Sequence, residues 1–305
     1  LAHLVQALRQ EDPAYLVHEY LNANWQPLYP TQVTAMMMGA GLSPVGPVQL
    51  ADTMDATAWP PTLRPFMADH AAGPLRELMG DIAVNRSFRG DLYGRDVQRL
   101  ADGDLARQRD AARFTLAAPA GQCQPLAARP FHMVPLDPAA HAAILDRLGA
   151  GTTDLGTLRA LPAVRVLGPE GALHLLTLMV QAGQLCAVPG DAPINNADRL
   201  NRALVAQARH GRPAGFLAAP AIAGSVSTGM ADTLMLGAFL EGEWEGEADP
   251  AARVWQDIAA LGHPLPWGDM LITPDATGRD QLRDLTDRFR RDLAPRLRLF
   301  GILPG

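Results

Sequence analysis

Prolines interrupt the helical patterns of this 305-residue chain at short intervals and limit it to short helices. Pro13 and Pro169 suit the first turn of a helix, because an amide there has no partner to lose. Pro27 and Pro30 end the pattern that Pro13 begins. The brief apolar run LCAVP, 185–189, predicts a strand. The sequence therefore predicts a mainly α fold.

The length suits two domains, and 48% hydrophobic residues can supply a core to each. We predict a mostly helical domain over 1–115 and a second domain over 116–305. The stretch LAAPAGQCQPLAARP, 116–130, has the composition of a linker between them. Residues 43–62 are rich in proline and turn residues, and they predict a connector within the first domain.

The second domain opens with short helical patterns over 138–151, 153–162 and 168–183. Thr153 or Asp154 is placed to cap the second of them. Together with the strand after Gly183, these helices have the layout of a winged helix, so we predict a winged-helix-like unit with a β wing.

A winged helix raises the question of DNA. The polar residues of its third helix are few, and a base-reading helix would present more arginine, lysine, asparagine or glutamine. These residues are Glu170, His174, Thr177 and Gln181. We therefore favour a winged helix that packs against protein.

Carboxyl-terminal helices complete the predicted fold, over 195–211, 225–242 and 278–303. The last has apolar residues at three- and four-residue steps, which indicates one buried face. They are Leu282, Leu285, Phe289, Leu293 and Leu297. Pro295 should kink this helix.

Charge excludes several classes of function. The 26 basic residues are outnumbered by 32 acidic ones, which gives a net charge of −6 and disfavours nucleic acid as a partner. All the basic residues are arginine. The absence of lysine excludes a P-loop lysine, a Schiff-base lysine and a kinase-type lysine.

The two cysteines, Cys123 and Cys186, are too far apart in sequence for a C-x-x-C motif, and two do not suggest a disulfide scaffold. No apolar run approaches the ~20 residues of a membrane span, and no signal peptide opens the sequence. We expect a cytoplasmic protein with no membrane partner. Because the chain opens on Leu1 inside a helical pattern, we also expect it to be part of a longer polypeptide.

The motif HEYLN, 18–22, is close to the H-E-x-x-H motif of zinc proteases. That motif needs a second histidine four residues after the first, and Asn22 occupies its position. We therefore expect no metal site, and we interpret His18 and Glu19 as a helix surface. The opposite face should be core, and it consists of Leu16, Val17, Tyr20 and Leu21.

The segment AGSVSTG, 223–229, resembles a G-x-S-x-G nucleophile elbow only superficially, because neither serine has a glycine on both required sides. No strand is predicted before it. We expect Ser227, Thr228 or Asp232 to cap the following helix instead.

The segment VNRSFRGDLYGRD, 84–96, gathers arginines around two aromatic residues. Its arginines are Arg86, Arg89 and Arg95, and its aromatic residues are Phe88 and Tyr93. Such a group can stack on a base or bind a carboxylate. Asp91 and Asp96 balance its charge, so a solvated face or an interdomain salt-bridge patch is the alternative.

An adenosylmethionine site of the Rossmann type needs a D-x-G-x-G-x-G loop after a strand, because the backbone must approach the cofactor closely. No such loop occurs in 1–305. We therefore expect neither cofactor-binding nor catalytic residues in this chain.

The amino-terminal region nevertheless resembles the methyltransferase regulatory domain of bacterial adenosylmethionine-dependent methyltransferases. Its pattern is a D-x-x-Y-L-x-H-E-Y-L helix, a break that carries N/Q, P and Y, and a G-L-x-Y-L element. The matching residues are Asp12, Tyr15, Leu16, His18, Glu19, Tyr20, Leu21, Gln26, Pro27, Tyr29, Gly41 and Leu42. Ser43-Pro44 departs from the usual continuation.

The family's R-N-R-x-F-R element is echoed by Asn85, Arg86, Phe88 and Arg89, with Val84 in place of its first arginine. The resemblance covers about 12–95, and more weakly the rest of the chain. Related proteins include the rickettsial outer-membrane-protein lysine methyltransferases, whose catalytic Rossmann domain precedes this region. From the resemblance, the candidate interaction or structural residues are His18, Glu19, Tyr20, Tyr29, Asn85, Arg86, Phe88 and Arg89.

Two functions follow as hypotheses. In the first, the chain is a regulatory or substrate-engaging module of an adenosylmethionine-dependent protein methyltransferase, and its partners are a catalytic domain in cis or trans and a protein substrate. In the second, it is a freestanding winged-helix-like adaptor that binds another protein. The first predicts exposed apolar surface on the amino-terminal helices, where the catalytic domain would dock.

Overall fold

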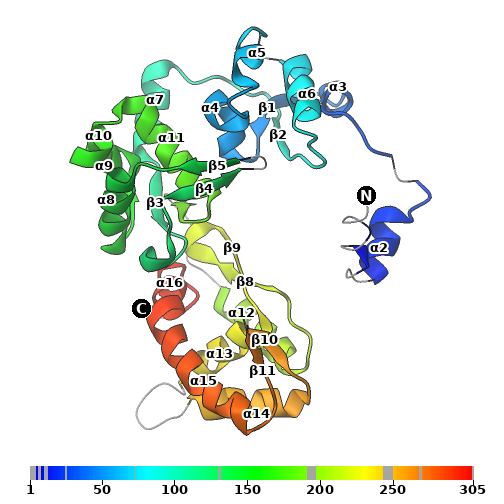
Figure 1. Cartoon of the computed structure of the whole chain (residues 1–305), viewed down its shortest axis with the longest axis vertical. Helices are drawn as coiled ribbons and strands as arrows, with labels where there is room; N and C mark the ends of the chain where they lie inside the picture. The colour runs from blue at the N-terminus through cyan, green and yellow to red at the C-terminus, as the bar shows by residue number, and fades with distance from the viewer. Residues whose placement is uncertain are drawn as a thin grey trace. The chain divides into compact units, whose positions relative to one another are not determined.

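The computed structural model describes residues 5, 8, 9, 13–24, 26–71, 73–129, 132–190, 197–242, 250–267 and 270–303. Contacts between residues divide the chain into two compact units, Leu1–Arg99 and Leu100–Gly305. Helices predominate in the described residues, and the strands form small antiparallel sheets (Figure 1). The predicted mainly α fold is thereby confirmed.

The first unit contains short helices and one two-stranded sheet. The helices are α2 Pro13–Tyr20, α3 Pro30–Gly39, the 3-10 helix η1 Leu50–Thr53, α4 Asp55–Ala58, α5 Arg64–Ala68 and α6 Pro74–Ala83. The sheet pairs β1 Ser43–Pro47 with β2 Asp91–Gly94. The buried cluster of this unit consists of Ala58, Trp59, Met67 and Val84.

Helix α2 corrects the prediction that one face of the HEYLN helix is core. None of its residues is buried, and Val17 and Tyr20 are each about half exposed, at 53% and 50%. Leu21, which follows the helix, is 74% exposed. Helical periodicity identifies an apolar face but not what covers it. Asp12, the first residue of the family pattern, lies outside the described residues.

Helix α3 begins at Pro30, with Tyr29 at its N-cap and Thr31 inside its first turn. The side-chain oxygen of Gln32 accepts a hydrogen bond from the backbone amide of Tyr29, at 2.8 Å. Gly41 follows the helix in the left-handed conformation, at a φ of 76°, which glycine adopts readily at a helix end.

Strand β1 lies within the region predicted as a connector. Its pairing with β2 is irregular between Pro44 and Gly46, where one extra residue enters the strand. Proline cannot donate to a sheet, but a two-stranded sheet leaves one side of each strand free. The segment is therefore a strand in spite of its two prolines.

The second unit begins with α7 Asp102–Ala111 and a three-stranded sheet. In that sheet β3 Arg113–Leu116 lies between β6 Thr153–Asp154 and β7 Leu185–Val188. The predicted strand after Gly183 is thus confirmed as β7. Its described partner, β3, precedes the helices of the predicted winged helix in sequence.

The predicted short helices are present between these strands. They are α8 Pro138–Gly149, α9 Leu155–Ala160, α10 Pro162–Arg165 and α11 Gly168–Gln181. The interval before α8 holds the 3-10 helix η2 Ala120–Gln122 and the hairpin of β4 Leu126–Arg129 and β5 His132–Pro135. The linker interpretation of 116–130 is wrong, because Leu116, Cys123 and Ala127 are buried in the core around these helices.

The carboxyl-terminal part has its own core. Its elements are α12 Ala197–Arg209, β8 Phe216–Ala219, η3 Pro220–Ile222, β9 Gly224–Ser227, α13 Met230–Leu240, α14 Pro250–Leu261, β10 Leu265–Trp267, β11 Met270–Ile272, α15 Ala276–Arg288, the π-helix η4 Phe289–Leu293 and α16 Ala294–Leu299. Strands β8 and β9 pair with each other, as do β10 and β11.

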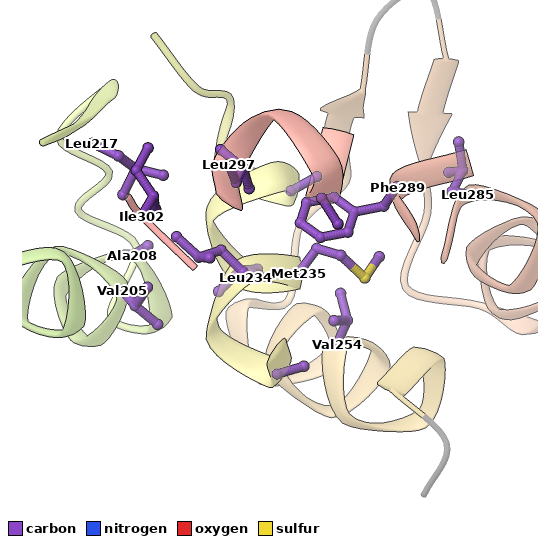
Figure 2. Packing of buried hydrophobic residues seen from close by; sticks show 14 of the residues in the cluster. Val205, Ala208, Leu217, Leu234, Met235, Val254, Leu285, Phe289, Leu297 and Ile302 are labelled. Carbon is purple, nitrogen blue, oxygen red and sulfur yellow. The ribbon is translucent and has the colours of Figure 1, made fainter. Parts of the chain in front are cut away.

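Helix α13 supplies much of this core, and Figure 2 shows Leu234 and Met235 between side chains of α12, α14 and the last helices. The predicted apolar face of the carboxyl-terminal helix is confirmed, because Leu282, Leu285, Phe289 and Leu297 are buried. The kink predicted at Pro295 stays a prediction; two residues before that proline, a π-helical turn of the chain ends at Leu293.

The AGSVSTG segment differs from its prediction. Strand β8 does precede it, and residues Gly224–Ser227 form strand β9 rather than a helix start. The N-cap of α13 is Gly229, which has no side chain to cap with. The hydroxyl of Ser227 instead donates to the backbone oxygen of Gly215, at 3.3 Å. The pairing of β9 with β8 makes this segment a strand. The prediction failed because a local capping pattern carries no information about strand pairing.

Candidate functional site

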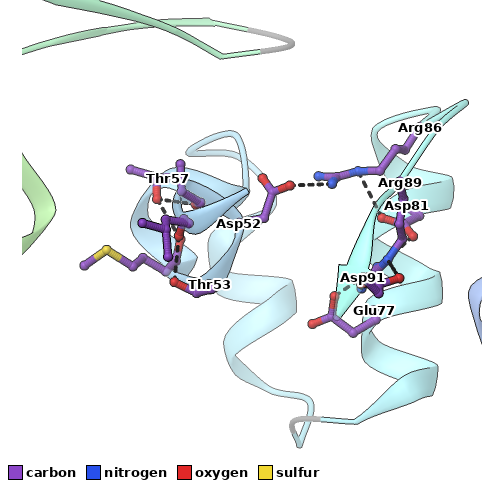
Figure 3. Close-up of polar contacts among 11 residues, drawn as sticks. Asp52, Thr53, Thr57, Glu77, Asp81, Arg86, Arg89 and Asp91 are labelled. Carbon is purple, nitrogen blue, oxygen red and sulfur yellow. Dashed lines mark hydrogen bonds and ion pairs between the residues drawn. The ribbon is translucent and has the colours of Figure 1, made fainter. Parts of the chain in front are cut away.

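Arg89 is the best-connected side chain of the arginine motif, and it joins β2 to α6 (Figure 3). Its Nε and Nη2 donate to the two carboxylate oxygens of Asp91, at 2.7 and 2.8 Å. Its Nη1 donates to Asp81, at 2.9 Å, and lies 3.1 Å from Glu77 Oε2. These contacts, the hydrogen bonds to Asp91 foremost, raise the pKa of Arg89. Its charge is therefore fixed.

Arg86 forms the second half of this network. Its Nη1 donates to Asp52 of η1 at 2.6 Å, and its Nε lies 3.1 Å from Asp81 Oδ1. Asp81 thus lies between the two guanidinium groups, and its side chain is only 8% exposed. The network ties η1, α6 and β2 together in the first unit.

Asn85 makes this arrangement possible at the end of α6. It adopts a left-handed conformation, with a φ of 47°, which asparagine tolerates better than most residues. The backbone amide of Arg86 then donates to the backbone carbonyl oxygen of Asp81, at 2.9 Å. The chain leaves the helix at this point and delivers both arginines to carboxylates on nearby elements.

The remaining predicted residues lie apart from the network. Phe88 is 85% exposed between the two arginines. His18, Glu19 and Tyr20 are exposed on α2, and Tyr29 is exposed at the start of α3. In the described part of the chain, the side chains of His18 and Glu19 make no hydrogen bond. The structure therefore brings together Asn85, Arg86 and Arg89, but not the HEYLN residues.

A pocket of about 190 Å³ lies beside this network, between α3, the β1–β2 sheet and the start of α6. Four prolines line it, namely Pro30, Pro44, Pro47 and Pro74. Its polar residues include Thr34, Glu77, Arg89, Asp91 and Tyr93. The hydroxyl groups of Thr34 and Tyr93 are hydrogen-bonded at 3.1 Å, which joins α3 to β2.

Sequence reasoning missed the pocket and the acidic partners of the arginines. Glu77 and Asp81 are four residues apart and share a face of α6. This spacing could have predicted an acidic helix face as a partner for the arginines. The pocket itself had no such signal, because the proline-rich strand that lines it was predicted as a connector.

A second cavity, of about 270 Å³, lies in the second unit between α7, α9 and the start of α11. It is lined by Arg159 and Arg165 among others, and Arg159 donates to Asp110 at 2.5 Å. Arg165 is exposed. In the described ranges, no group of three or more histidine, cysteine, aspartate or glutamate residues is arranged to hold a metal ion. Nor is any helix there long and apolar enough to cross a membrane.

These features define the first unit as a small helical module built on an arginine–carboxylate network. Residues 12–95, which include that network, match the family model of the predicted methyltransferase regulatory domain. The resemblance predicted from the sequence is thereby confirmed over this region.

Known proteins resemble the chain over nearly its whole length. The uncharacterized protein sll1526 of Synechocystis sp. is 22% identical over 302 residues, which are 98% of this chain and 59% of that protein. The structure of PKMT2 from Rickettsia typhi shares the fold, with a TM-score of 0.57 at 15% identity, over 98% of this chain and 63% of that one. The structure of the same protein in complex with AdoHcy has a TM-score of 0.56 at 15% identity, over 98% of this chain and 62% of that one. The chain thus spans about three fifths of the length of these relatives.

Proposed function

We propose that the chain is a regulatory or substrate-engaging module of an adenosylmethionine-dependent protein methyltransferase, and that the cofactor site lies in a separate catalytic domain. The match of 12–95 to the methyltransferase regulatory domain supports the class. The fold shared with PKMT2, whose structure was also determined with AdoHcy, supports the link to methyl transfer. We further propose that the second unit contains a winged-helix-like element, formed by α8–α11 and β7, that packs against protein.

The exposed apolar surface of α2 carries the proposal. Val17, Tyr20 and Leu21 are all at least half exposed, although the helix pattern predicted them as core. Apolar side chains gathered on one helix face are typical of a surface that another protein covers. We propose the catalytic domain, in cis or in trans, as that protein.

The strand arrangement supports a cofactor site elsewhere. A Rossmann-type site lies at the carboxyl ends of parallel strands. Every strand pairing in the described residues is antiparallel. Titration calorimetry of the chain with adenosylmethionine should therefore show no binding, and micromolar affinity would contradict this part of the proposal.

The coding sequence upstream of Leu1 distinguishes the two candidate functions. An in-frame D-x-G-x-G-x-G loop would identify the catalytic domain and support docking in cis. A start codon directly before Leu1 would favour a separate subunit or the adaptor, and a catalytic domain would then be tested in trans.

Docking itself can be measured with surface variants. The double variant Val17→Ser, Leu21→Ser should bind the purified catalytic domain about tenfold more weakly or worse, because two apolar contacts are lost. Leu200→Ser is the matched control, since Leu200 is 48% exposed on α12 of the second unit. Equal binding by the double variant and the wild type would exclude α2 as the docking surface.

A further inference from the structure

The pocket of the first unit combines apolar walls with an unbalanced charge. At about 190 Å³ it is larger than the ~150 Å³ engineered cavity that accepts benzene, so it can hold one long side chain. Pro30, Pro44, Pro47 and Pro74 form rigid apolar parts of its wall. An occupant should therefore have an apolar portion that lies along the prolines.

Glu77 is the carboxylate in this pocket whose charge is least neutralised. Arg89 already donates two hydrogen bonds to Asp91 and one to Asp81. Glu77 lies 3.1 Å from Nη1 of Arg89, but in the described part of the chain its side chain makes no hydrogen bond. The Glu77 side chain is 34% exposed, whereas that of Asp81 is 8% exposed. Its carboxylate can therefore accept a hydrogen bond from an incoming group.

The charge of the surrounding network points to a cation. Two guanidinium groups, those of Arg86 and Arg89, face four carboxylates, those of Asp52, Glu77, Asp81 and Asp91. The other nearby arginines do not line the pocket. Arg76 pairs with Asp55, and the guanidinium of Arg95 lies beside Gly41. The field in the pocket is thus negative, and it opposes an anionic occupant.

We propose that this pocket binds the basic side chain of a peptide segment, with its aliphatic stem along the prolines and its cationic head on Glu77. Lysine and arginine side chains combine these two properties. Residues 1–305 contain no lysine, so a bound lysine must come from outside this stretch of sequence. This inference deepens the proposed function, because it names the kind of side chain that a substrate-engaging module recognises. Only the claim that the cation belongs to a peptide rests on the proposed function.

The test uses the intact chain and the blocked pentapeptide acetyl-Gly-Gly-Lys-Gly-Gly-amide, with chemical-shift perturbation as the readout. We expect shifts at amides of α3, β2 and α6. We also expect about tenfold weaker binding of the norleucine analogue, which keeps the stem but lacks the charge. Arginine should replace lysine. Equal affinity for lysine and norleucine would overturn the proposal.

Variants assign the effect to Glu77. Glu77→Gln should weaken lysine-peptide binding about tenfold, because the amide keeps the shape and loses the charge. Glu77→Asp keeps the charge and should restore part of the affinity, which separates recognition from a folding defect. Glu170→Gln is the matched control on exposed α11 surface and should bind as the wild type does. Unchanged binding by Glu77→Gln would overturn the assignment.

A competition experiment distinguishes a peptide side chain from a free small cation as the ligand. If n-butylammonium displaces the peptide at concentrations similar to those of the peptide itself, a free small cation is the ligand and the peptide proposal fails. None of these measurements includes a catalytic domain. Failure here therefore leaves docking through α2 intact, and failure of docking leaves the peptide measurement intact.

Discussion

Trp59 and Gly80 fit together in the first unit with no room for a methyl group. A Cβ atom added to Gly80 would lie 2.1 Å from Cη2 of the buried indole ring and 2.4 Å from Cζ3. Trp59 is 3% exposed, so its ring has little space to move. The glycine is needed here for close packing of α6.

Gly80→Ala should therefore lower the free energy of unfolding of the first unit by about 1–3 kcal/mol, the usual cost of overpacking a core. Urea denaturation followed by circular dichroism would measure it. Gly39→Ala is the control, because a Cβ at Gly39 meets nothing within 4 Å. Stability of Gly80→Ala equal to that of Gly39→Ala would contradict this packing.

Residue chemistry was only partly predictable. The sequence identified Arg86 and Arg89 and offered carboxylate binding as one of their roles. It could not identify Asp52 as a partner, because that contact joins residues 34 positions apart and depends on how η1 packs near α6. A local pattern specifies the charge of a side chain, and tertiary packing specifies what that charge meets.

Among the elements, α9 shows how a predicted cap works. Thr153 and Asp154 were both candidates, and the structure selects Asp154. Its carboxylate accepts from the backbone amide of Thr157 at 2.7 Å and from the Thr157 hydroxyl at 2.9 Å. These hydrogen bonds, the backbone one foremost, lower the pKa of Asp154. The folded state thus favours the ionised cap.

Because the pKa of Asp154 is lower in the folded state, its ionisation stabilises the fold at pH values above the pKa in the unfolded chain, which is about 4. This stabilisation is lost as the pH falls through the pKa of the folded state. At pH 7, Asp154→Ala should cost about 1 kcal/mol. We expect this difference from the wild type to shrink below about pH 4. Asp154→Asn should keep a cap that does not titrate. Urea titrations at neutral and acidic pH would check this, and a difference as large in acid as at neutrality would contradict it.

The elements that sequence reasoning missed share one physical cause. Strands β1 and β9 each form by pairing with a partner, β2 and β8. Helices form from local hydrogen bonds, so α8, α11 and α12 could be predicted from spacing alone. A strand with prolines, such as β1, has no local pattern that distinguishes it from a connector.

At the scale of the whole molecule, each unit has a core of its own. Trp59 and Met67 belong to the core of the first, and Leu234 to one in the second. The division at Arg99 places α7 and β3 in the second unit, because α7 contacts α9 and β3 pairs with β6 and β7. These pairings connect distant positions in the sequence and could not be predicted from composition. The domain boundary predicted at residue 115 stays a prediction.

Because each unit has its own core, a destabilising substitution in one core should affect the stability of that unit only. Leu234 is fully buried, so Leu234→Ala should cost about 2–5 kcal/mol. Hydrogen exchange should then accelerate at amides of α13 and not at those of α6, and Gly80→Ala should show the reverse. Faster exchange in both helices for either variant would show that the two cores do not respond separately.

Helix α2 carries a thermodynamic consequence. It has eight residues, none of them buried, and isolated helices shorter than about 12 residues are marginal in water. Fixing a backbone residue costs about 1–2 kcal/mol of conformational entropy. A partner that binds this helix must therefore also supply the free energy that holds it folded. Its measured affinity would understate the contact energy, and the burial of Val17, Tyr20 and Leu21 would appear as a negative heat-capacity change on association.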